Sequence, residues 1–112
     1  MNQDVQSIWQ QAAIQLFKDC GKEFHRQEIG RIGNKAELIA QAIRLITSLV
    51  EEGGQALTSA LYRLDIPEKS IRMKTRDESP DDRLTTVAIA AAERCIQKVE
   101  MRRLYSNTDT NG

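Results

Sequence analysis

Apolar residues recur at intervals of three and four positions along most of the chain, which is the spacing of helices that bury one face. No stretch alternates apolar and polar residues for long enough to indicate a strand. The pattern therefore predicts an all-α fold, a compact bundle of three long helices and two short ones. The long helices are expected at about 3–28, 34–52 and 80–105, and the short ones at about 55–64 and 67–74.

The first predicted helix has the least clearly marked end. Its apolar positions from Val5 to Cys20 share one face, and Phe24 falls on the same face if the helix continues. We therefore expect this helix to pass through Gly21 and to end near residue 28.

The other helices carry clearer signals at their ends. Asn34 with Glu37 forms a capping box at the start of the second long helix, and Gly53 suits the left-handed position after its end. Pro67 and Pro80 stand where helices begin. The last residues, 106–112, contain no apolar side chain, and we expect a disordered tail there after a single helical domain over residues 1–105.

Composition excludes several classes of protein. Sixteen basic residues balance sixteen acidic ones, so the zero net charge predicts no strong attraction to nucleic acids or to a membrane surface. No apolar run is long enough to span a bilayer, and the first residues lack the pattern of a signal peptide. Cys20 and Cys95 both fall on apolar helix faces. We expect a cytoplasmic protein in which these two thiols are reduced and buried.

Cys20 and His25 come closest to a catalytic arrangement. On a continuous helix, residues five apart are about 140° apart, so the thiol would face the core and the imidazole the solvent. A zinc site would need both distant cysteines and the single histidine, and the adjacent acidic pairs are explained by helix ends and solvated loops. We therefore predict no catalytic, cofactor-binding or metal-ligating residue, and no enzyme.

The segment 55–76 resembles a helix-turn-helix motif, with one helix that ends at Leu64 and a second that turns Ile71 inward. The candidate contacts to a phosphate backbone are Lys69, Arg72, Lys74 and Arg76. Two positions depart from the motif: Leu61, where a small residue is usual, and Asp65, where glycine is usual. The acids that follow weaken the positive field; they are Asp77, Glu78, Asp81 and Asp82. Nucleic-acid binding is therefore the alternative function.

The three long helices present apolar faces that cover about half of each helix surface. Such faces often overfill the core of a small bundle and are completed by a second subunit. The small side chains on the last helix allow another helix to approach closely there. This stretch is the possible self-association face, formed by Ala88, Ala91, Ala92 and Cys95. Alternatively, the two short helices close the core within one subunit.

The last helix also carries a row of basic residues at intervals of four, Arg94, Lys98 and Arg102. Like charges at this spacing repel unless an acidic group faces them. The row suits either a contact with an acidic neighbour such as Glu51 and Glu52, or side-chain stems that shield the edge of the core. Together these features predict a non-enzymatic helical protein that acts through helix-face contacts, as a homodimer or with a protein partner.

Overall fold

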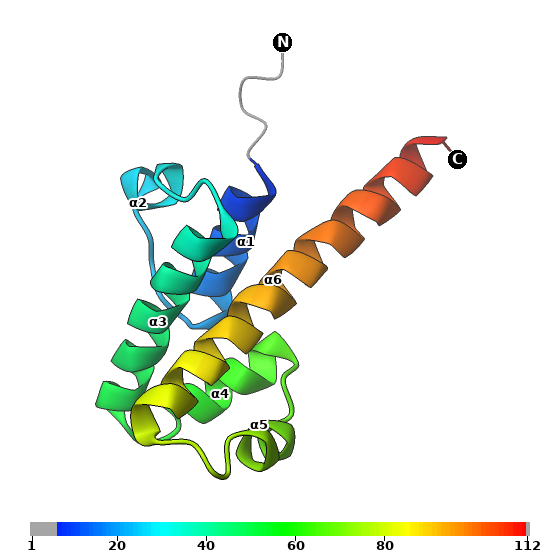
Figure 1. Cartoon of the computed structure of the whole chain (residues 1–112). Coiled ribbons are helices and arrows are strands. Elements are labelled where there is room, and N and C mark those ends of the chain that lie inside the picture. The colour runs from blue at the N-terminus through cyan, green and yellow to red at the C-terminus, as the bar shows by residue number, and fades with distance from the viewer. Residues whose placement is uncertain (1–6, 112) are drawn as a thin grey trace.

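The computed structural model of the chain describes residues 7–111, and their side chains as far as residue 106. Within this range the chain is helical and contains no strand, so the predicted all-α fold is confirmed (Figure 1). The helices are α1 (Ile8–Asp19), α2 (Arg26–Gly30), α3 (Lys35–Glu52), α4 (Ala56–Leu64), α5 (Glu68–Lys74) and α6 (Pro80–Asn111).

Helices α1, α3 and α6 form the centre of the bundle, and the short helices α4 and α5 cover one end of it (Figure 1). Helix α6 packs against both α1 and α3, while α4 contacts all three long helices. The interior is a single apolar cluster to which every helix contributes. Its largest fully buried apolar side chains are Leu16, Leu38, Ile46, Leu64, Val99 and Cys95.

The prediction that the first helix continues through Gly21 is wrong. Helix α1 ends at Asp19, and Gly21 follows with a φ of +70°, a conformation that glycine adopts without steric cost. The amide of Lys22 donates to the carbonyl of Phe17 (2.9 Å) and that of Gly21 to the carbonyl of Lys18 (3.0 Å), which is a Schellman motif. Phe24 reaches the core from the following loop rather than from a helix. The residues before Ser7, where the helix was expected to start, lie outside the described range.

The cap predicted for α3 forms in part. The side chain of Asn34 accepts from the amide of Glu37 (2.9 Å), as expected. The Glu37 carboxylate accepts from Gly33 instead of Asn34 (2.9 Å), one residue further from the helix. At the other end, Gly53 has the predicted positive φ, +75°.

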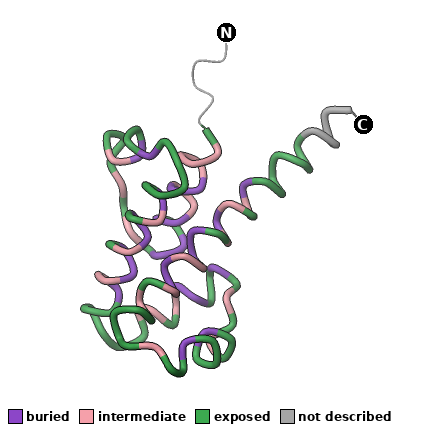
Figure 2. Tube along the Cα trace, viewed as in Figure 1, coloured by how far each residue is buried: buried purple, intermediate pink, exposed green. Residues whose placement is uncertain are grey.

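Helix α6 extends well past its predicted end at residue 105. A helix of 32 residues is about 48 Å long, and the longest dimension of the molecule is 48 Å. The carboxyl-terminal part of α6 therefore leaves the body of the bundle (Figure 1). Val99 is fully buried, whereas residues 100–106 are all exposed (Figure 2). The segment expected to be a disordered tail continues α6 as far as Asn111, and Gly112 lies outside the described range.

Candidate interaction surfaces

The small side chains on α6 lie at an internal helix crossing. All four residues of the predicted self-association face, Ala88, Ala91, Ala92 and Cys95, are 0% exposed in the single chain. Helix α6 meets α1 and α3 over this region, and α1 contributes Ala12 and Ala13, which are equally buried. The small side chains thus accompany a helix crossing within the chain, and the chain's own helices cover the four residues of the predicted self-association face.

The basic row on α6 faces the ends of two helices of the same chain. Lys98 Nζ lies 2.8 Å from Asp19 Oδ2 and donates to the carbonyl of Arg63 (2.8 Å). Arg94 Nε donates to the carbonyl of Leu64 (3.1 Å). Arg63 and Leu64 end α4, so their carbonyl groups lack intrahelical partners and carry partial negative charge, whereas the contact with the end of α1 is made by the Asp19 carboxylate. The row therefore joins α6 to the ends of α1 and α4, rather than to Glu51 and Glu52.

The two cysteines are buried and free, as predicted. Burial, together with the nearby Asp19 carboxylate, raises the pKa of Cys20 to about 11 and that of Cys95 to about 12. The thiols thus stay protonated at neutral pH and are poor nucleophiles. Cys20 is buried at the end of α1, whereas His25 is exposed in the loop that follows. The two side chains therefore lie in different surroundings, although they are not on one continuous helix as the prediction assumed. Within the described range, histidine, cysteine and carboxylate side chains form no cluster suited to a metal ion.

The helix-turn-helix segment has some of the geometry that the motif requires. Leu64 and Ile71 are buried, and Asp65 has φ +60° and ψ +38°, so the turn adopts the left-handed conformation that glycine usually supplies. The four basic candidates, Lys69, Arg72, Lys74 and Arg76, are all exposed. However, α5 is only seven residues long, and Arg72 pairs with Glu68 on the same helix (3.0 Å).

The projecting end of α6 presents an apolar face to solvent. Met101, Leu104 and Tyr105 are 49%, 64% and 62% exposed, and their spacing places them on one side of the helix. This side is about half a turn away from Val99, the last buried residue. The three were not predicted as a contact face, because periodicity alone does not separate exposed apolar residues from core residues. The sequence does show that these three residues fall on the opposite side of the helix from Cys95 and Val99.

A groove of about 520 Å³ lies at the opposite end of α6, where α3, α4, α5 and the start of α6 meet. Its apolar lining consists of Ile46, Val50, Leu57, Leu61, Ile71, Leu84 and Val87. Charged side chains of both signs also line it, namely Glu68, Asp81, Arg72 and Arg83. The bundle thus has an apolar concave surface at one end of α6 and an apolar protruding surface at the other.

The chain matches no protein-family model, no curated protein and no solved structure. No helix in the described part of the chain has the length and apolar character needed to cross a membrane.

Proposed function

We propose that this chain is a non-enzymatic helical protein that self-associates through the projecting end of α6. The observation that carries the proposal is the exposed face formed by Met101, Leu104 and Tyr105 on a helix that leaves the bundle. Single exposed apolar residues are ordinary, but a contiguous group on a protruding helix marks a contact surface. Removal of such area from water stabilises a complex by roughly 25 cal/mol per Å².

The occupant that best fits this face is the apolar groove of a second copy. The groove has an apolar lining, and its charged rim carries both signs, Glu68 and Asp81 with Arg72 and Arg83. The apolar protruding end of α6 and this apolar concave surface are therefore the complementary features that favour insertion of one copy into the other. Around a two-fold axis, each copy inserts the end of its α6 into the groove of the other copy. Both ends of each α6 then lie in the interface.

The chemistry of the described residues supports a binding role over a catalytic one. A nucleophilic thiol must be ionised and must reach its base. The pKa of each cysteine is raised by burial, and His25 lies on the surface.

Sedimentation equilibrium over a range of protein concentrations tests the proposal. We expect a monomer–dimer equilibrium in the parent and a shift to monomer in Leu104→Glu, which places a charge in the middle of the apolar face. Tyr62→Glu is the matched control, because Tyr62 is 83% exposed on α4 and outside the face. A parent that stays monomeric up to a concentration of about 200 μM, where even a weak Kd of order 10⁻⁵ M gives dimer, contradicts the proposal.

A nucleic-acid-binding role is the second candidate, favoured by the left-handed turn at Asp65. Retention on duplex DNA would then fall steeply with salt, and neutralisation of Lys69 or Arg76 would lower the logarithmic salt slope by about one each. Absence of retention even at low salt removes this candidate.

A further inference from the structure

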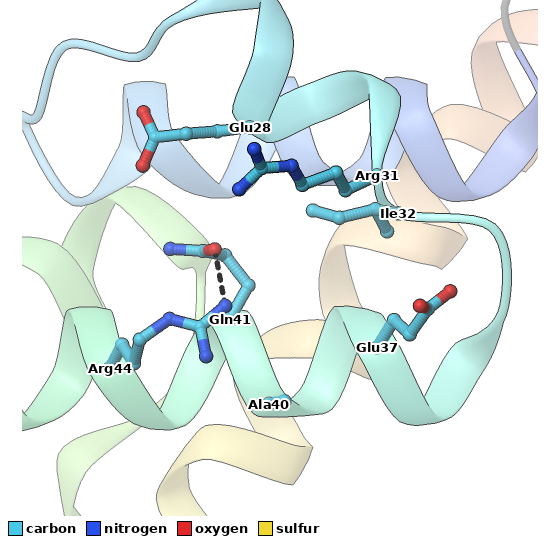
Figure 3. A pocket seen from close by; sticks show the side chains of 7 residues that line it. All are labelled: Glu28, Arg31, Ile32, Glu37, Ala40, Gln41 and Arg44. Carbon is cyan, nitrogen blue, oxygen red and sulfur yellow. Dashed lines mark hydrogen bonds between the residues drawn. The ribbon is translucent and has the colours of Figure 1, made fainter.

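A second concave surface lies between α2 and α3, away from the apolar groove (Figure 3). Its volume is about 480 Å³, and its lining consists of Glu28, Arg31, Ile32, Glu37, Ala40, Gln41 and Arg44. Arg31 directly follows α2 and Arg44 lies on α3. Figure 3 shows both guanidinium groups turned toward the space between the two helices.

The two acidic residues of this pocket are engaged with the backbone. Glu28 Oε1 accepts from the amide of His25 (3.0 Å) at the start of α2. Glu37 Oε1 accepts from the amide of Gly33 (2.9 Å) just before α3. Within the described part of the chain, neither Arg31 nor Arg44 forms an ion pair. Two guanidinium groups and two carboxylates thus line one space, and the carboxylates are hydrogen-bonded to backbone amides rather than paired with the arginines.

A buried amide orients part of this pocket. Gln41 is only 7% exposed, and its Oε1 accepts from Arg44 NH2 (2.8 Å). This hydrogen bond fixes the Arg44 guanidinium, and the amide NH2 of Gln41 points away from Arg31, toward the space below Glu28 (Figure 3). The pocket therefore combines two guanidinium groups with an amide donor that a rigid helix holds in place.

We propose that this pocket binds a small oxyanion, a carboxylate or a phosphate group. Guanidinium groups donate two parallel hydrogen bonds to such groups, and the amide of Gln41 adds a neutral donor. An anion between Arg31 and Arg44 also offsets the mutual repulsion of the two cations. The carboxylates of Glu28 and Glu37 are held by the backbone amides of His25 and Gly33, so the arginines are the groups that meet the anion.

Titration of the full chain with inorganic phosphate and, separately, with acetate tests the site, with sodium chloride at the same ionic strength as reference. The readout is the NMR signals of the Gln41 side-chain amide and of the arginine Nε–H groups. We expect saturable shifts in at least one titration. Saturable shifts with phosphate alone would identify a phosphate site, and shifts with acetate alone a carboxylate site. Shifts with both anions would identify a general oxyanion site.

Variants localise the binding. Arg31→Gln and Arg44→Gln should each weaken it about tenfold or more, since each removes charged hydrogen bonds. Arg31→Lys should also weaken it, because lysine lacks the forked donors. Arg26→Gln is the matched control, as it removes the same charge from α2 outside the pocket. No saturable shift with either anion, or an equal loss in Arg26→Gln, overturns the proposal.

Discussion

Substitution of Ala91 by leucine tests the internal helix crossing. Ala91 is 0% exposed where α6 meets α1 and α3, so the three added carbon atoms have no free volume to occupy. Overpacking of a dense core costs about 1–3 kcal/mol, a large share of a stability of order 5–15 kcal/mol. For a domain of this size the melting temperature should fall by about 4–12 °C.

The assay is thermal and urea unfolding at several protein concentrations. Because the crossing lies within one chain, the loss in free energy of unfolding should be the same at every concentration. Ala36→Leu is the matched control, since Ala36 is exposed in the first turn of α3 and leucine is nearly as good a helix former there. A variant within about 0.5 kcal/mol of the parent would refute the close crossing, because that is the scatter of ordinary surface substitutions. A loss that disappears at high concentration would place the crossing between subunits.

Three further predictions concern the buried groups around α6. Cys20 and Cys95 should react with thiol reagents far more slowly in the native state than in urea, and rapid native labelling of both would contradict their burial. Folding raises their pKa from 9.0 to about 11 and about 12, so their contribution to stability is complete below pH 9 and lost as the pH rises from 9 toward 12. The free energy of unfolding should therefore fall more steeply above pH 9 in the parent than in a variant with both cysteines changed to alanine; parallel curves would rule this out. Asp19→Asn should cost about 1–3 kcal/mol in urea unfolding, because it leaves the 18%-exposed Lys98 without its carboxylate. The Asp65 side chain is 65% exposed, and its carboxylate lies 4.0 Å from Lys98 Nζ. Asp65→Asn should therefore lower the free energy of unfolding by less than about 1 kcal/mol. A loss equal to that of Asp19→Asn would contradict the role of Asp19 as the main partner of Lys98.

The parts of the fold that local signals determine could be predicted from the sequence. Asn34 and Gly53 bound α3, and Pro80 opens α6, because caps and prolines act on the backbone within one turn. The break at Gly21 was missed because Phe24 sits at a helical interval from Cys20 by coincidence. Its ring reaches Phe17 from a loop, at 5.7 Å between centroids, and periodicity alone does not show whether the backbone between two apolar residues is helical.

The candidate surfaces depend on features that only the folded chain shows. Met101 and Leu104 are exposed because α6 is longer than the helices it packs against, and no local pattern gives that difference in length. Arg31 and Arg44 line one pocket because the short connection between α2 and α3 places the end of α2 beside α3. The basic residues Arg94 and Lys98 were correctly placed beside the core, but their partners are ends of helices distant in sequence.

The central claim is that the end of α6 in one copy occupies the groove of another. Isotope-filtered NMR on a mixture of methyl-labelled and unlabelled chains tests it most directly, because only contacts between copies give signals. The account predicts intermolecular contacts from the methyl groups of Met101 and Leu104 to those of Ile71, Leu84 and Val87. A dimer whose intermolecular signals come from other residues, or a sample without such signals at high concentration, would contradict it.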